Sequence, residues 1–167
     1  ELYELFPTSR QGLLAPLYVA EMYKKTDQTQ KSQNAYEKAL QHYKKQYERL
    51  EDISSGAVFK FFIALTHASQ RDWNSAVRHW KELNEKYTEA DLVAPTSLTL
   101  GEIYFSKLKE KSKAVEQFQY VIDTFPDSAH AQRAMIKLIQ IHFTTSDFDQ
   151  AIHFAEMLRD STDKEEI

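Results

Sequence analysis

Hydrophobic side chains recur along the chain at intervals of three and four residues, in stretches separated by short polar segments. This spacing places them on one face of an α-helix, so the pattern predicts a helical protein. The stretches fall into pairs, and the helices expected first in each pair span residues 11–25, 55–69, 92–108 and 129–145. Those expected second span residues 30–50, 73–87, 111–125 and 148–159. The connections are only a few residues long, so each pair is expected to fold as an antiparallel hairpin.

Polar side chains mark several of the expected helix starts. Three of the first helices follow residues that can cap the free amides of a first turn, namely Ser54, Asp91, and Asp127 or Ser128. Pro95 and Pro126 fall at or before a first turn, where a missing amide costs little. Pro16 lies deeper in its stretch, so that helix is expected either to begin near Leu13 or to kink.

A repeat runs through the same stretches. Phe125-Pro126-Asp127-Ser128 repeats the residue order of Phe6-Pro7-Thr8-Ser9, which stands 119 residues earlier. Ala76, Ala114 and Ala151 fall near the starts of three second helices, 38 and 37 residues apart. A short side chain lets two helices approach closely, so these alanines are expected at the contact within each hairpin.

The third pair carries the clearest motif. It reads Leu100-Gly101-Glu102-Ile103-Tyr104-Phe105, followed by Ala114, Phe118 and Pro126. This segment resembles the tetratricopeptide repeat, a helical pair with small and aromatic signature positions. The resemblance implies an all-α fold, a right-handed α-solenoid of about four antiparallel helix pairs. The sequence departs from the family pattern by one extra residue between Gly101 and Ala114.

The resemblance extends over nearly the whole chain and implies a single array. Residues 1–9 are expected to end a preceding repeat, and four repeats are expected at residues 10–52, 53–89, 90–126 and 127–163. The chain is therefore expected to be a fragment of a longer bacterial protein. The Phe-Pro-x-Ser motif that ends a repeat also resembles cell-envelope members of the family, such as outer-membrane assembly lipoproteins and Tol-Pal accessory factors. That likeness favours the periplasm or cell envelope over the cytoplasm.

Composition removes several classes of function. The 167 residues include only 3 Gly and 4 Pro, too few for the turns of an all-β fold. The chain has no Cys, which excludes disulfides, thiolate zinc sites, iron–sulfur clusters and thiol nucleophiles. Its 21 Lys and Arg against 25 Asp and Glu give a net charge of −4, so no affinity for nucleic acid is expected. No stretch approaches the ~20 apolar residues that span a bilayer, and no direct membrane insertion is expected.

The sequence offers no catalytic constellation, so the protein is not expected to be an enzyme and no cofactor is implied. The six His are scattered, with no third ligand at a spacing that would close a metal site. His67 and His142 stand where the family usually has an aromatic residue. Asp147 and Asp149 could form a carboxylate pair, but their place in a turn favours helix capping.

The family's groove positions can be carried over to this sequence. In the family, first helices line a concave face that binds an extended peptide or a helix. The positions that match are Leu17, Glu21, Phe61, Leu65, Leu98, Glu102, Arg133 and Gln140. They imply a noncatalytic module that holds a protein or peptide partner in a centrally apolar groove. Phe61 and Leu65 could instead be core residues, because a shift of one residue in register would turn them inward.

The long helix expected at residues 30–50 carries a further candidate surface. Its apolar residues are spaced 4, 3, 4 and 3 residues apart, a heptad stripe, made of Tyr36, Leu40, Tyr43, Tyr47 and Leu50. This stripe could pack on Phe59, Phe62 and Ile63 of the next pair. Alternatively, Tyr43 and Tyr47 could mediate self-association as a homodimer. In that case the chain would be a structural array that spaces or assembles attached domains.

Overall fold

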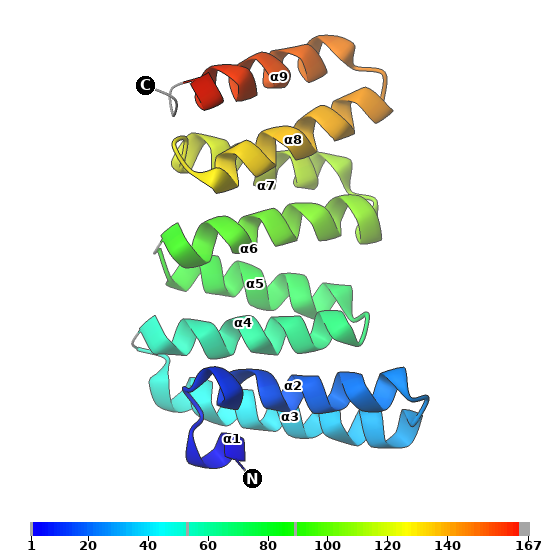
Figure 1. The fold of residues 1–167 in the computed structure, drawn as a ribbon, viewed down its shortest axis with the longest axis vertical. Helices are drawn as coiled ribbons and strands as arrows, with labels where there is room; N and C mark the ends of the chain where they lie inside the picture. Colours follow the sequence, from blue (N-terminus) through cyan, green and yellow to red (C-terminus); the bar gives the residue numbers. More distant parts are fainter. Residues whose placement is uncertain (1, 53, 89, 164–167) are drawn as a thin grey trace. The chain divides into compact units, whose positions relative to one another are not determined.

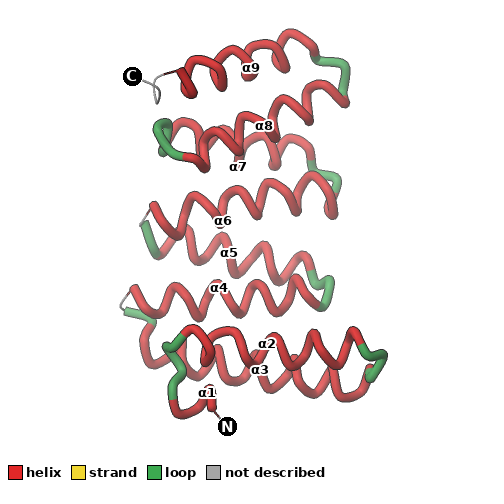
Figure 2. Tube along the Cα trace, viewed as in Figure 1, coloured by secondary structure: helices red, strands yellow, loops and turns green. Residues whose placement is uncertain are grey.

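The computed structural model describes residues 2–52, 54–88 and 90–163. These residues form helices and turns with no β-strand, as Figures 1 and 2 show, and the predicted all-α fold is confirmed. The helices are α1 (Leu2–Leu5), α2 (Arg10–Lys25), α3 (Thr29–Leu50), α4 (Ser54–Ser69), α5 (Trp73–Lys86), α6 (Ala90–Ile103), the π-helix η1 (Tyr104–Leu108), α7 (Lys111–Thr124), α8 (Ala129–Thr144) and α9 (Phe148–Asp163).

The chain divides into two compact units, residues 1–87 and 88–167. In unit 1, α1 is followed by the antiparallel hairpins α2/α3 and α4/α5 (Figure 1). In unit 2, α6 and η1 pair with α7, and α8 pairs with α9. Both units are built alike, because the second helix of the first hairpin packs on the first helix of the next, α3 on α4 and α7 on α8. The two first helices of each unit also touch, α2 with α4 and α6 with α8.

Small residues sit at the helix contacts, as the repeat predicts. Ala76, Ala114 and Ala151 are all buried. Ser32 takes the equivalent place in α3, where its hydroxyl donates to the carbonyl of Ala20 at 3.0 Å. Only short side chains fit at such crossings, because a larger one would force the two backbones apart.

The turn inside each hairpin uses one recurring geometry. A non-glycine residue adopts the left-handed conformation in every one of the four turns. These residues are Asp27, Arg71, Lys109 and Ser146, with φ of 56°, 63°, 60° and 59°. The next amide then bonds back to the end of the first helix, as when the amide of Asp72 donates to the carbonyl of His67 at 3.0 Å. This pattern ends a helix by satisfying one of its last free carbonyls.

The extra residue of the third hairpin is absorbed by the π-helix η1. In α2, α4 and α8 the closing bond spans five residues, but in the third hairpin the amide of Glu110 reaches the carbonyl of Tyr104, six residues back. A π-helical turn holds one residue more than an α-helical turn. The single α-helix predicted over residues 92–108 therefore ends at Ile103 and continues as a π-helix to Leu108.

Some predicted helix starts are wrong by a few residues. Ser128 does cap α8, accepting a hydrogen bond from the amide of Ala131 at 3.1 Å. Ser54 and Asp91, by contrast, lie inside the first turns of α4 and α6, and the residues before those helices lie outside the described part.

Of the two prolines expected at or before a first turn, Pro126 precedes α8 as predicted, whereas Pro95 lies elsewhere. Helix α2 begins at Arg10 and not near Leu13, because Ser9 caps it by accepting from the amide of Gly12 at 3.0 Å. Pro16 is consequently an interior residue of α2, and Pro95 lies within α6 rather than at its start. Each proline removes one helical hydrogen bond that packing against neighbouring helices has to offset.

Candidate functional site

The first helices of unit 2 border a cleft of about 220 Å³. Helix α6 and η1 supply one wall, α8 supplies the other, and a ring from α7 contributes to the lining. The lining residues are Glu102, Phe105, Ser106, Phe118, Lys137, Gln140 and Ile141. Two of the predicted groove residues, Glu102 and Gln140, are thereby brought together from separate hairpins.

A salt bridge crosses the cleft. Oε1 of Glu102 lies 2.8 Å from Nζ of Lys137, which joins α6 to α8. Both side chains are partly exposed, so the pair contributes at most about 1 kcal/mol to stability. A pair of this strength can exchange partners cheaply, and both charged groups remain available to the polar groups of a ligand.

The π-helix supplies the part of the lining that sequence reasoning missed. Phe105 and Ser106 both belong to η1, and the hydroxyl of Ser106 donates to the carbonyl of Glu102 at 2.6 Å. Insertion of one residue in a helix changes which side chains face a given direction. The extra residue between Gly101 and Ala114 was therefore the signal in the sequence that could have pointed to this wall.

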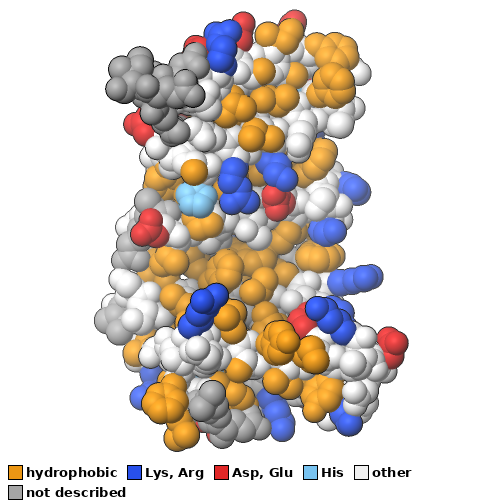
Figure 3. Space-filling model, viewed as in Figure 1, with side chains coloured by type: hydrophobic (Ala, Val, Ile, Leu, Met, Phe, Trp, Pro, Cys, Tyr) orange, Lys and Arg blue, Asp and Glu red, His pale blue; other side chains and the backbone are white. Residues whose placement is uncertain are grey.

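The exposed face of α8 lies beside the cleft. Arg133, Ile136, Gln140 and Phe143 follow one another at intervals of 3, 4 and 3 residues and are all exposed, Ile136 by 42% and Phe143 by 64%. The Phe143 ring meets the ring of Phe148 at 5.7 Å. Figure 3 shows hydrophobic side chains exposed over α8 and α9. Exposed apolar side chains of this size next to a polar cleft are typical of a binding surface.

The predicted residues of α2 have internal partners. Leu17 is buried in the core of unit 1. Glu21 accepts a hydrogen bond from the hydroxyl of Tyr36 and lies 3.7 Å from Nζ of Lys24. Burial and this bond to Glu21 both raise the pKa of Tyr36. Lys24 also donates to the carbonyl of Ser69, so the group ties α2 to α3 and α4.

The remaining predicted residues vary in exposure. Phe61 and Leu65 are half-buried at the edge of the unit 1 core, and the Phe61 ring centre lies 6.0 Å from that of Trp80. Leu98 is buried. The apolar residues predicted for the groove therefore lie in the core or at its edge. Of the polar ones, Glu21 is half-buried, and Glu102, Arg133 and Gln140 are exposed.

The two tyrosines considered for self-association lie in different surroundings. Tyr43 has no exposed surface, stacks on Phe62 with 5.2 Å between ring centres, and donates to the carbonyl of Leu13 at 2.6 Å. It therefore lies inside the core, where a second copy of the chain cannot reach it. Tyr47 is half-buried, with Nζ of Lys60 lying 5.0 Å from its ring centre.

The described residues were also searched for metal sites and for membrane-spanning helices. Among them, no three His, Asp or Glu side chains are placed to hold a metal ion. Within the same residues, no helix combines the length and the hydrophobicity needed to cross a membrane.

Comparisons with known proteins place this geometry in a class. Residues 97–128 match the family model of the tetratricopeptide repeat. The crystal structure of MamA is similar with a TM-score of 0.57 and 15% sequence identity, over 88% of this chain and 96% of that chain. No curated protein matches the chain significantly. At this identity the likeness to MamA shows the fold alone.

Residues 97–128 therefore match a tetratricopeptide repeat in the hairpin where the motif predicted it, and the chain has the all-α solenoid fold of helical repeats. Proteins of this class are typically noncatalytic, and their stacked hairpins serve as protein-binding scaffolds.

Proposed function

We propose that the chain binds a peptide or a helix of a partner protein on the first-helix face of unit 2. The observation that carries this proposal is the cleft between η1 and α8, which lies beside the exposed side chains of Ile136 and Phe143. The compartment in which this happens stays a prediction, with the cell envelope favoured by the Phe-Pro-x-Ser likeness alone.

The size of the cleft narrows the kind of ligand. Pockets for small molecules usually measure roughly 300–1,000 Å³, whereas this cleft measures about 220 Å³. It suits one apolar side chain of a longer ligand. Phe105 and Ile141 would contact that side chain, and the exposed face of α8 would contact its neighbours along the ligand.

Polar groups at the rim give the ligand its orientation. Gln140 can donate and accept hydrogen bonds, and Glu102 and Lys137 offer an acceptor and a donor on opposite walls. A peptide backbone presents alternating donors and acceptors that fit such a rim. The core of an interface with this composition is apolar, and specificity comes from its edge.

The test measures binding of peptides selected from a phage library of random 12-residue sequences against the purified chain. Phe143→Ser and Gln140→Ala are expected to weaken the selected peptides at least tenfold in isothermal titration calorimetry. The matched control is Ile152→Ser, because Ile152 is exposed to a similar extent as Phe143 but lies on the second helix α9. The proposal fails if the Phe143→Ser chain keeps full affinity, or if Ile152→Ser weakens binding as much.

The alternative, a structural array that spaces or assembles attached domains, is favoured by a different observation. Hydrophobic side chains on α1 and α2 are exposed at the beginning of unit 1 (Figure 3). Mass in solution separates the two functions, since assembly through this surface would make the mass increase with concentration.

A further inference from the structure

The turn before α2 repeats the turn before α8 bond for bond. In the segment Phe6–Ser9, Ser9 donates to the carbonyl of the first residue through its amide at 3.2 Å and through its hydroxyl at 2.8 Å, and it accepts from the amide of Gly12 at 3.0 Å. In Phe125–Ser128, Ser128 makes the same three bonds at 3.1, 2.6 and 3.1 Å. Helix α1 therefore stands before α2 as the last turn of α7 stands before α8.

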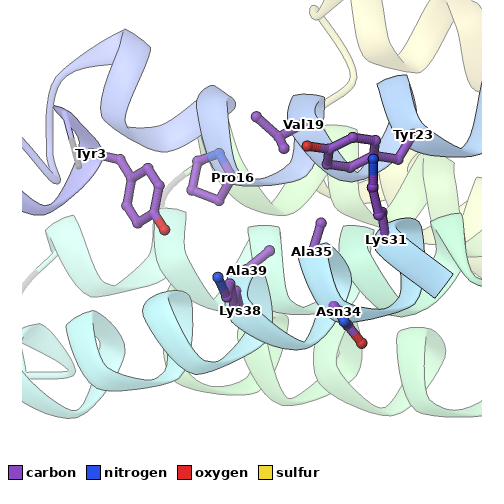
Figure 4. Close-up of a pocket in the computed structure, with 9 residues that line it drawn as sticks. All are labelled: Tyr3, Pro16, Val19, Tyr23, Lys31, Asn34, Ala35, Lys38 and Ala39. Carbon is purple, nitrogen blue, oxygen red and sulfur yellow. The ribbon is translucent and has the colours of Figure 1, made fainter. Parts of the chain in front are cut away.

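The side chains of α1 agree with this equivalence. Tyr3 lies three residues before Phe6, as Tyr47 lies three residues before Leu50 at the end of α3. Tyr47 covers Lys60 of α4. Figure 4 shows Tyr3 beside Pro16 of α2, the residue equivalent to Lys60. A residue of α1 thus occupies the place that a second helix fills in the next hairpin.

The rest of the α2 face that a preceding second helix would cover is exposed. Val19 is 44% exposed, whereas the equivalent residues Ile63 of α4 and Leu138 of α8 are 2% and 0% exposed beneath α3 and α7. Met22 is likewise exposed, and its equivalent Thr66 is fully buried.

Tyr18 extends the same surface. It is exposed, but its equivalent in α4 is Phe62, a buried ring on which Tyr43 of α3 stacks. In α4 this strip of the first helix is buried under the preceding second helix. In α8 the equivalents of Val19 and Met22, Leu138 and Ile141, are buried, whereas Lys137, the equivalent of Tyr18, is partly exposed. In α2 the strip is exposed, because the short helix α1 does not cover it.

The strip continues into a groove between α2 and α3 of about 460 Å³. Figure 4 shows its apolar residues, among them Pro16, Val19 and Ala39, with Lys31 and Lys38 of α3 along one edge. In the next hairpin the residue equivalent to Lys38 is Glu82, which pairs with Lys60. Pro16 offers no such charge, and Lys38 forms no ion pair within the described residues. A helix lying here would be favoured by carboxylates on the side that faces α3.

We propose that the uncovered face of α2, with Tyr18, Val19 and Met22, binds a second helix. This helix would continue α1 toward the N-terminus in the same polypeptide. In α3, Ala39 and Tyr43 stand eleven and seven residues before Leu50, and in α7, Ala114 and Phe118 stand equally far before Phe125. All four side chains are buried. If Phe6 is equivalent to Leu50 and Phe125, the same spacing of eleven and seven residues applies before Phe6. The proposed helix then has a small residue six positions before Glu1 and an aromatic residue two positions before Glu1. A helix from a second copy would first have to displace α1.

The test extends the chain with a helix that has this register. A copy of residues 111–119 placed directly before Glu1 puts an alanine and a phenylalanine at the two required positions. The extended chain is expected to melt about 5 °C or more above the parent, because the added helix buries Tyr18, Val19 and Met22. The matched control carries serine in place of the copied phenylalanine and is expected to lose most of the gain.

A second variant reads out the contact itself. Val19→Asp is expected to lower the melting temperature little in the parent and several degrees more in the extended chain, since only there would the carboxylate be buried. An unchanged melting temperature on extension, a gain that survives the serine control, or an equal effect of Val19→Asp in both chains would overturn the proposal. So would an equal stabilisation by the free nine-residue peptide, or a dimeric mass of the extended chain, because each would assign the seat to a separate molecule.

Discussion

Nδ1 of His142 lies 2.9 Å from Oδ2 of Asp147, and the same pair recurs in another hairpin, where Nδ1 of His67 lies 3.1 Å from Oδ2 of Asp72. Each His is near the end of a first helix, and each Asp directly precedes a second helix. The backbones are joined as well, because the amide of each Asp donates to the carbonyl of its His. In each of these two hairpins a polar link thus closes the turn.

Asp147→Ala is expected to reduce the free energy of unfolding by about 1 kcal/mol, because it removes the contact with His142. Asp149→Ala is the matched control: this carboxylate is exposed and should change stability by less than about 0.5 kcal/mol. Urea unfolding of both variants measures the difference. If both substitutions cost the same, the contact between Asp147 and His142 would add nothing to stability.

His79 should make the folded state lose stability as the pH falls below the pKa of an unperturbed histidine side chain. Burial, followed by the charges of Lys60 and Arg78, lowers its pKa to about 4, although Glu82 acts in the opposite direction. The ring also stacks on His67 at 5.3 Å. His79 is therefore neutral in the folded chain, while in the unfolded chain it binds a proton below about pH 6.5.

The stability that depends on this difference is complete above pH 6.5 and is lost as the pH falls from 6.5 toward 4, by on the order of 1–3 kcal/mol. His79→Gln keeps a polar side chain that does not titrate. The variant should therefore show a smaller drop in unfolding free energy between pH 7 and pH 4.5 than the parent, measured by urea denaturation. An identical drop in both chains would mean that His79 is protonated alike in the folded and unfolded states.

Gly101 is required by the ring packed against it. A Cβ atom at this position would lie 2.6 Å from Cε1 of Phe118, a ring that is almost completely buried. Alanine normally stabilises a helix interior by up to about 1 kcal/mol relative to glycine, but here the clash should dominate, so that Gly101→Ala destabilises by roughly 1–3 kcal/mol. Phe118→Leu should recover part of that loss in the double variant. Additive costs in a double-mutant cycle would show that the two residues do not touch.

Much of this architecture could be predicted from the sequence because it depends on local spacing. The intervals of three and four residues located the helices, and the recurrence of Ala76, Ala114 and Ala151 located the contacts within hairpins. The extra residue after Gly101 could be counted, but a bulged helix and a longer loop both accommodate one residue. The structure has the bulged helix, with Tyr104 buried in it, and such burial depends on tertiary packing.

The candidate site was less accessible to sequence reasoning. Consecutive helix residues point about 100° apart, so one residue of uncertainty in register separates a groove position from a core position. Burial also varies along a single helix face: Leu98 and Glu102 stand four residues apart on the same side of α6, yet Leu98 is buried and Glu102 lines the cleft. Lys137 could not be assigned to the cleft, because its ion pair joins two helices that are distant in the sequence.

Tyr43 is expected to be a stability residue. Tyr43→Ala should reduce the unfolding free energy by about 3–5 kcal/mol, because it leaves a cavity beside Phe62. Tyr43→Phe should cost only about 1 kcal/mol, for the bond to the carbonyl of Leu13. Denaturant titration gives both values. A light-scattering mass that changes in the Phe variant without loss of stability would contradict this assignment and revive self-association.

The π-helix is expected to be dispensable for the stability of the third hairpin. Deleting Lys107 removes the residue that η1 accommodates, so the closing bond of the turn would span five residues, as it does in the other hairpins. The chain should then fold with a change in unfolding free energy of less than about 1 kcal/mol, because a regular α-helical turn replaces the bulge. Deleting Thr144 is the matched control. Helix α8 has no extra residue, so the deletion should separate His142 from Asp147 and cost several kcal/mol.

If the two deletions destabilise the chain equally, the π-helix is a structural requirement of the third hairpin. If only the Thr144 deletion does, η1 is free to shape the cleft, and peptide affinity should fall in the Lys107 deletion while stability is kept.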